Sequence, residues 1–325
     1  MHLTLSRALL SSLAFGQCYA AVTWRTIGCD GWTHDGKNID QIWDNAQALV
    51  TNAQARIDAI PDGNSVFDEP ARRAGGNAKF MFGINFNRFT GIDQAGKVVM
   101  ASARGMYDAI QSGLARTLVG TEPNTAGAVF DMSNAFLFCG ANGLTHGTWD
   151  NNPLMQDVWY AKIQTGAITE YLVPSFSSHE RDENGNPLYE AKTFTTTQII
   201  DNGVEGQAPV TTQFIGIILC PTEGTKAVLE PGFAATDPTP EKPSPDKYIS
   251  VSGTLVHEMV HVVGQSRNKN YDDGEPLRYG FNLCTDLANT DQNKALILPD
   301  NYRIFAEMSM SPATKWFPTE VKKTT

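Results

Sequence analysis

The spacing of apolar residues predicts a long helix near the start of the chain. In residues 38–60, NIDQIWDNAQALVTNAQARIDAI, apolar side chains return every three or four positions and share one helical face. These positions are Ile39, Trp43, Ala46, Val50, Ala53 and Ile57. Asn38 is suited to cap the helix N-terminus. A second helical segment is expected from about Val98 to Leu118, and the Gly, Asp and Pro content of residues 61–77 predicts a connection.

The middle of the chain changes to the pattern of β-strands. Runs rich in β-branched and aromatic residues alternate with turn-forming residues, which is typical of strands. The expected strands fall within residues 126–140, 157–163, 193–200 and 214–221. Residues 177–190 are polar and are expected to form a loop. The sequence therefore predicts a β layer after an N-terminal helical part.

Helical patterns return toward the end of the sequence. Residues 230–247 contain five prolines, which predict an irregular segment, either a plain surface loop or an exposed flap. An apolar helix is expected around residues 255–263, with Gly264 as its C-cap. Residues 284–289 and 299–310 also indicate helices. The predicted fold class is α+β, with an N-terminal helical part, a β layer and C-terminal helices.

Composition restricts the classes of function. The 325 residues include 41% hydrophobic side chains and carry a formal net charge of −10. This composition fits a folded protein rather than a disordered one. Sequence-independent binding to nucleic acid requires Lys and Arg to neutralise phosphates, so the acidic balance argues against it. Acidity also serves simple solubility, and it permits cationic substrates without requiring them.

The first residues have the order of a secretory signal peptide. Basic Arg7 precedes an apolar run, residues 8–15, and then the small residues Ala20 and Ala21. Cleavage is expected after Ala20, which leaves residues 21–325 as a single domain, with two lobes around a cleft as a variant of that arrangement. No later apolar stretch approaches the roughly 20 residues that span a bilayer. We therefore expect a secreted monomer outside the membrane.

Four cysteines remain after residue 20, and an even number in an oxidising compartment predicts two disulfides. Cys139 and Cys220 each end an apolar run that is expected to be a buried strand. We therefore expect Cys139 to pair with Cys220, and Cys29 with Cys284. Three pairings of four cysteines are possible, and the sequence alone does not decide among them.

Residues 257–261, HEMVH, carry the clearest chemistry. His257 and His261 are four residues apart, so a helix places both on one face, where two imidazoles can bind one Zn²⁺. Glu258 follows the first histidine and can reach a water at the metal as a general base. The neighbouring residues are apolar, and unpartnered polar groups in such a helix would be costly. By contrast, His34, His146 and His179 are isolated and are expected to be structural or surface residues.

The third metal ligand is not fixed by the spacing. A histidine three residues after Gly264 would complete one common motif, but that residue is Arg267. A glutamate twenty residues after His261 would complete another, but that residue is Phe281. The nearest downstream carboxylates are Asp272, Asp273 and Glu275.

Together these motifs resemble the deuterolysin-type, or aspzincin, metallopeptidases of the secreted fungal branch. The matching pieces are the HExxH core, the acidic run, Tyr279-Gly280, and Cys284 at the start of a helix. Residues 299–308, PDNYRIFAEM, resemble the closing helix of that family. The resemblance covers roughly residues 250–310. It implies a zincin-like fold, an aspartate as third zinc ligand, and a role for Tyr279 in stabilising the oxyanion.

The loop departs from the family spacing at one position. The aspartate should stand three residues before the tyrosine, where this chain has Pro276. We favour an aspartate over Glu275 and retain both Asp272 and Asp273 as metal ligands. The expected function is a secreted zinc endopeptidase with one Zn²⁺ per chain, acting on protein or peptide substrates, with Glu258 and Tyr279 as catalytic residues. The alternative is a weak or inactive zincin-fold protein that binds zinc or a partner.

Overall fold

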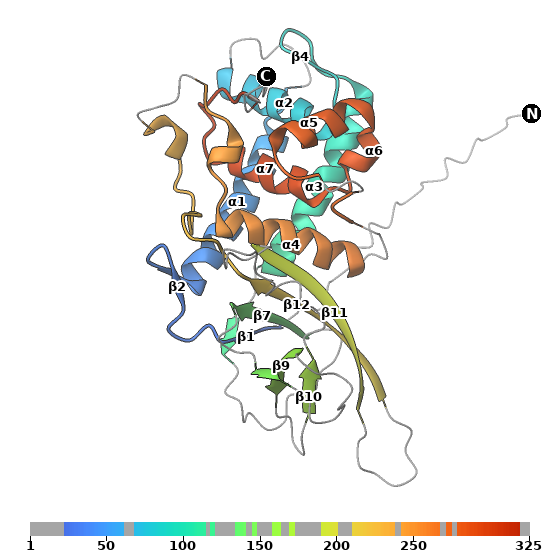
Figure 1. The fold of residues 1–325 in the computed structure, drawn as a ribbon. Helices are drawn as coiled ribbons and strands as arrows, with labels where there is room; N and C mark the ends of the chain where they lie inside the picture. Colours follow the sequence, from blue (N-terminus) through green and yellow to red (C-terminus); the bar gives the residue numbers. More distant parts are fainter. Residues whose placement is uncertain are drawn as a thin grey trace, which may run out of the picture.

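The computed structural model describes twelve segments of the chain and combines a helical layer with a β layer (Figure 1). The described residues are 23–61, 68–114, 118–120, 134–140, 145–147, 158–163, 169–172, 190–200, 210–237, 242–266, 271–274 and 278–318. The expected signal peptide, residues 1–20, lies outside them. The mixed architecture confirms the α+β fold class.

The first helix forms where the apolar spacing predicts it. Helix α1 spans Ile39–Asp58, and Asn38 caps it with a complete capping box: its side chain accepts from the Gln41 amide, and the Gln41 side chain accepts from the Asn38 amide. All the predicted apolar positions are buried. Within the core, the Trp43 ring meets Trp24 edge to face, with centroids 5.4 Å apart.

The predicted connection after α1 contains the start of a helix that its Gly, Asp and Pro content did not predict. Helix α2 spans Glu69–Phe82, with Asp68 as N-cap and left-handed Gly83 as C-cap. Pro70 lies in its first turn, where the missing N–H costs no hydrogen bond. Gly75 lies against the Phe86 ring, which occupies the space of a Cβ atom. The expectation of a plain connection over residues 61–77 was wrong because these turn-type residues serve as caps and as a packing contact.

Helix α3 spans Gln94–Leu114, so it begins and ends earlier than the predicted 98–118. Its last turn is tied to the core. Trp24 Nε1 donates to the Gly113 carbonyl at 3.2 Å, and Trp43 Nε1 donates to the Leu114 carbonyl at 2.8 Å. These bonds satisfy carbonyls that have no partner within the helix. Leu118 then belongs to a strand.

Within the described residues, the main sheet has five strands in the order β11-β12-β7-β1-β6. The strands are β11 (Ala191–Ile200), β12 (Val210–Leu219), β7 (Asn134–Cys139), β1 (Thr23–Ile27) and β6 (Leu118–Gly120). All neighbours pair in parallel except the edge strand β11, which runs antiparallel to β12. Three of the predicted strand regions therefore lie in this sheet.

Smaller sheets complete the β structure. A three-stranded antiparallel sheet contains β8 (Thr145–Gly147), β9 (Val158–Ile163) and β10 (Thr169–Leu172). Strand β9 corresponds to the prediction for residues 157–163. Two short hairpins pair β2 (Thr33–His34) with β3 (Lys37–Asn38), and β4 (Phe86–Asn87) with β5 (Gly91–Ile92). The predicted loop at 177–190 lies outside the described residues except for Glu190.

The disulfide joins Cys29 to Cys139, with Cα atoms 4.9 Å apart. Strands β1 and β7 are parallel neighbours with Ile27 opposite Phe138, so both strand ends reach the same edge of the sheet. The predicted pairs, Cys139 with Cys220 and Cys29 with Cys284, are therefore wrong. Cys220 and Cys284 are buried thiols in the structure, and Cys284 lies in the helical layer rather than in the sheet.

The C-terminal part is helical, as predicted. Helix α4 spans Val251–Ser266, and α5 (Phe281–Thr290), α6 (Gln292–Ala295) and α7 (Pro299–Ser309) follow. The preceding proline-rich segment holds only the 3₁₀ turns η2 (Phe233–Ala235) and η3 (Pro245–Lys247), with residues 238–241 outside the described part. Figure 1 shows α4 between the sheet and the other helices.

Gly264 does not end α4, because the helix continues to Ser266. The Tyr271 ring fills the space that a Cβ atom at position 264 would occupy. The C-cap prediction was therefore wrong, and the glycine instead lets the next loop pack closely on the helix. Among the described residues, no helix combines the length and apolar character needed to cross a membrane.

Candidate metal centre

Helix α4 carries both histidines of the HExxH sequence on one face. The two imidazole rings have centroids 5.2 Å apart, as expected for positions one helical turn apart. Every residue from Val251 to Val260 is buried, so the helix is enclosed on all sides along this stretch. His257 is only 5% exposed, and its ring therefore depends on partners inside the protein.

Asp273 is the carboxylate that reaches the two histidines. Its Oδ1 lies 3.0 Å from His257 Nε2 and 3.4 Å from His261 Nε2. One ligand atom from each of the three residues lies within 4.8 Å of the others. Asp272 is exposed, and its Oδ1 accepts from the Gly274 amide at 3.0 Å. Glu275 lies outside the described residues. The structure thus brings Asp273 to the histidines and leaves Asp272 away from the cluster.

The hydrogen bonds behind the rings fix which nitrogen carries the proton. His261 Nδ1 lies 2.8 Å from the Tyr271 carbonyl oxygen, which can only accept, so Nδ1 donates. His257 Nδ1 faces the Asp300 carboxylate at 3.4 Å in the same way. In the neutral imidazoles both Nε2 atoms then offer a lone pair toward Asp273.

Asp273 Oδ1 is buried and receives no hydrogen bond in the described part of the chain. When both imidazoles are neutral, three lone pairs therefore converge on one point. A bound cation satisfies all three at once, and two imidazoles with one carboxylate form a donor set that zinc accepts. The group can hold a metal ion. The sequence pattern predicts its three members, although it does not separate Asp273 from Asp272.

Charge in the cluster shifts the pKa values of its members. Burial alone lowers the pKa of His257, but the carboxylates of Asp273, Asp300 and Glu258 raise it to about 10 when no cation is present. Burial raises the pKa of Asp273, and the two imidazoles outweigh this effect and hold it well below its ordinary value. A cation that binds here therefore displaces the proton from His257 Nε2.

Behind His257, a chain of buried charges runs along α7. Asp300 accepts from Arg303 through both oxygens, at 2.6 and 3.0 Å, and Arg303 also donates to Glu307 at 2.9 Å. Glu307 Oε1 accepts from the amide and hydroxyl of Ser250, the residue directly before α4. The chain therefore ties α7 to α4. We call Asp300, Arg303 and Glu307 the α7 relay.

Sequence analysis did not identify the α7 relay. Residues 299–310 were assigned only to a helix and to a family resemblance. The available signal was the spacing of the three charges at i, i+3 and i+7 in a helix that is otherwise rich in apolar side chains. All eleven residues of α7 are buried, so these charges cannot lie on a solvated face.

Glu258 and Tyr279 also lie at the centre, as anticipated for catalytic residues. Glu258 is 5% exposed, and its Oε2 accepts from Thr193 Oγ1 on edge strand β11 at 2.7 Å. The Tyr279 ring stacks against His257, with centroids 5.9 Å apart. Partial burial and the nearby carboxylates, Asp273 first among them, raise the pKa of the Tyr279 phenol, so it remains a hydrogen-bond donor at neutral pH.

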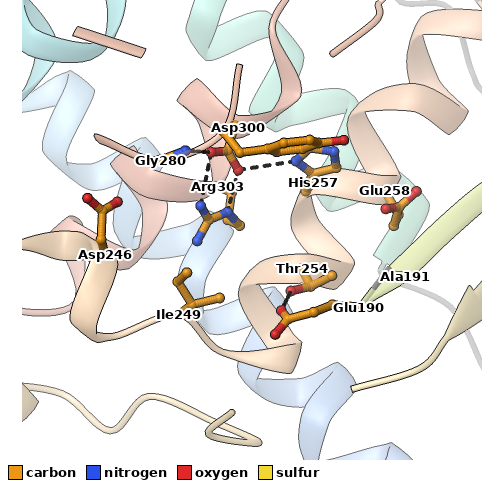
Figure 2. Close-up of a pocket in the computed structure, with 11 residues that line it drawn as sticks. Glu190, Ala191, Asp246, Ile249, Thr254, His257, Glu258, Gly280, Asp300 and Arg303 are labelled. Atoms are coloured by element: carbon orange, nitrogen blue, oxygen red, sulfur yellow. Dashed lines mark hydrogen bonds and ion pairs between the residues drawn. The ribbon is translucent and has the colours of Figure 1, made fainter. Parts of the chain in front are cut away.

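The centre opens onto a cavity of about 570 Å³, within the range of ligand-binding pockets. His257, Glu258, Tyr279 and Thr254 line it, together with Asp300 and Arg303 of the α7 relay. Figure 2 shows Asp300 and Arg303 beside His257, and Glu190 below Thr254, directly before β11. One candidate metal ligand, His257, therefore faces the same space as the candidate base Glu258 and the candidate oxyanion donor Tyr279.

The isolated histidines do not join the centre. His34 Nε2 lies 2.6 Å from the Thr225 carbonyl oxygen, and its ring stacks on Trp32. These contacts fit the structural role expected for His34. The side chain of His146 and all of His179 lie outside the described residues.

Comparison with known proteins adds no family to this geometry. No family model matches the chain, and no curated protein matches it. The resemblance to aspzincins therefore rests on the residues of the motifs themselves.

Proposed function

We propose that this protein is a secreted zinc-dependent endopeptidase of the deuterolysin-like type, with a zincin-like fold. The supporting observation is the convergence of His257, His261 and Asp273 on one point, with Glu258 lining the same cavity as His257. Two imidazoles and a carboxylate also hold iron(II) in other enzymes. The glutamate directly after the first ligand favours hydrolysis at zinc over that chemistry.

In this proposal each residue has one task. His257, His261 and Asp273 hold the metal, and zinc, when bound, supplies a Lewis acid that makes water more acidic and polarises a carbonyl. Glu258 takes a proton from the attacking water and returns it to the departing amine. Tyr279 donates a hydrogen bond to the oxygen that gains negative charge. Its raised pKa keeps that proton in place.

The α7 relay supports the metal ligands without contacting the substrate bond. Asp300 accepts from His257 Nδ1, which places the proton of the neutral ring on Nδ1 and aims Nε2 at the cluster. Arg303 holds the pKa of Asp300 well below its usual range, despite complete burial, so the acceptor remains charged. Asp300 and Arg303 are therefore positioning residues in this proposal.

Export is proposed on the order of the first residues, Arg7, the apolar run 8–15 and Ala20-Ala21. The disulfide between Cys29 and Cys139 is compatible with an oxidising compartment. N-terminal sequencing of the protein from culture medium tests it, and a mature N-terminus at Ala21 is expected.

The deciding experiment compares Glu258→Gln with the unchanged protein. Metal analysis after dialysis should find about one zinc per chain in both, because this substitution leaves the three ligands intact. Casein cleavage should fall by roughly 10²–10⁴-fold, the usual contribution of a general base. Glu230→Gln removes the same charge at an exposed position and should leave cleavage unchanged. Undiminished cleavage by the Glu258 variant refutes the mechanism.

The second candidate is a zinc-binding protein without turnover. One contact favours it: Thr193 already donates to Glu258 Oε2, so one oxygen of the proposed base is occupied. Stoichiometric zinc together with no cleavage of casein or protamine supports this reading. The absence of bound zinc contradicts both candidates.

A further inference from the structure

A second cavity, of about 340 Å³, lies between helix α2 and the segment after α7. Arg72, Arg73 and Phe80 line it from α2, while Lys315 and Trp316 line it from the C-terminal segment. It shares no lining residue with the cavity at the metal centre. Its volume falls within the range that binds small molecules.

The charge of this cavity is opposite to that of the protein. Its lining includes four cationic side chains, Arg72, Arg73, Arg88 and Lys315, and one carboxylate, Glu69. The chain as a whole carries a net charge of −10. Glu69 pairs with both Arg72 and Arg73 and neutralises only one of these charges. The site therefore retains a cationic excess where the rest of the molecule would repel an anion.

Three nitrogen donors at this cavity lack an acceptor within the described segments. Trp316 is 4% exposed, and its indole Nε1 finds no partner among the described residues. The Nε atoms of Arg72 and Arg73 are also buried and receive no acceptor there. A buried N–H without an acceptor destabilises the folded protein. The same cavity thus combines surplus positive charge with donors that an oxyanion would satisfy.

The backbone leaves room for such a ligand. Gly76 lines the cavity, and an added Cβ there would meet no atom within 4 Å. Gly75, one position earlier, faces the Phe86 ring instead. A side chain at position 76 would therefore fill ligand space rather than disturb packing.

We propose that this cavity binds a small oxyanion, a phosphate or a carboxylate on a compact organic body. Arginine forks are matched to the paired oxygens of both groups. The Trp316 indole then donates to the same anion, so the N–H signal of this indole reports binding at this cavity. This binding is independent of metal and of the proposed peptidase activity.

The test titrates the mature, zinc-loaded protein with inorganic phosphate and, separately, with succinate at constant ionic strength. The readout is the ¹H–¹⁵N spectrum of the tryptophan indoles, of which the chain has six. Trp316→Phe assigns the Trp316 signal. We expect a saturable shift of that signal, and the probe that saturates at the lower concentration identifies the preferred anion.

Matched variants decide whether the cationic cavity is responsible. Arg72→Gln with Arg73→Gln should weaken the binding by about tenfold or more, since charge-assisted hydrogen bonds are lost. Arg104→Gln removes an arginine that pairs elsewhere, with Asp58 and Asp108, and should leave it unchanged. Gly76→Leu should block binding while all the cations remain. A linear or absent shift with both probes, or equal weakening by Arg104→Gln, overturns the proposal.

Discussion

Asp300 lies on the opposite side of the His257 imidazole from the metal-ligand cluster, with its Oδ1 3.4 Å from His257 Nδ1. The carboxylate is completely buried and belongs to α7, whereas the histidine belongs to α4. The His257 ring therefore contacts a different partner through each of its two nitrogens. Its Nε2 faces the candidate metal-ligand cluster, and its Nδ1 makes a contact between α4 and α7.

Asp300→Ala should lower zinc affinity by roughly 10–100-fold, the usual effect of removing a partner behind a metal-bound histidine. Asp300→Asn keeps an acceptor for Nδ1 and should lose less. Chelator competition measures both, at a temperature where circular dichroism shows folded protein, because Arg303 loses a buried partner in each variant. Equal affinities of the alanine variant and the unchanged protein would contradict the positioning role.

Asp273→Asn should remove most of the bound zinc, because the amide brings no negative charge between the two Nε2 atoms. Asp272→Asn makes the same chemical change one residue earlier and should retain zinc near one per chain. Elemental analysis after dialysis compares the two. If zinc is lost from the Asp272 variant instead, the choice between these neighbours is reversed.

Gly253→Ala should reduce the free energy of unfolding by roughly 1–3 kcal/mol. The added methyl group would overlap Glu307 Oε1, and Glu307 can move only by giving up its bonds to Ser250 and Arg303. Gly105→Ala, in α3, meets nothing within 4 Å and should be neutral or stabilising by up to about 1 kcal/mol. Urea unfolding measures both variants. If Glu307 is not held by Ser250 and Arg303, the two substitutions should change the free energy of unfolding by similar amounts.

The pH dependence of stability should show the ionisation of Glu307. Burial is the main reason that the pKa of Glu307 rises to about 7 in the folded protein, from an ordinary 4.5. Folding therefore favours the protonated form. That contribution is complete below about pH 4.5 and is lost as the pH rises through about 7, a change of about 3 kcal/mol.

Glu307→Gln removes this titration, so its unfolding free energy should vary less between pH 4.5 and 8 than that of the unchanged protein. Urea unfolding with excess zinc across this range measures both curves. Arg303 pairs with Glu307, but Asp300 continues to neutralise it in the variant. Parallel curves would show that Glu307 is ionised throughout the range.

The sequence predicted the elements whose pattern was local. Helix α1 has an apolar stripe and a cap, and each can be recognised within a few residues. Helix α2 was missed because its proline and glycines have meaning only in three dimensions: Gly75 faces Phe86, and Gly83 ends the helix. The cysteine pairing was predicted wrongly for a related reason. The order of strands in the sheet decides which strand ends lie side by side, and the sequence does not reveal that order.

The site follows the same division. His257 and His261 are four residues apart, so helical periodicity alone places them on one face, and Glu258 directly follows His257. Choosing Asp273 over Asp272 requires the path of the loop after α4. The spacing to Tyr279 does not predict that path, because it is longer than the family spacing. Asp300 stands on another helix, and no local pattern connects it to His257. Sequence reasoning could therefore find the ligands but not the residue that orients one of them.

The α7 relay also has a consequence for the order of events during synthesis. Ribosomes release the chain from its N-terminus, and domains begin to fold as they emerge. His257 and Asp273 appear before Asp300, and Glu307 appears later still. A nascent chain can thus expose the three candidate metal ligands before the helix that holds the partner of His257 has been made. In the proposed function, full metal affinity therefore requires α7 to dock, which comes late in the production of the protein.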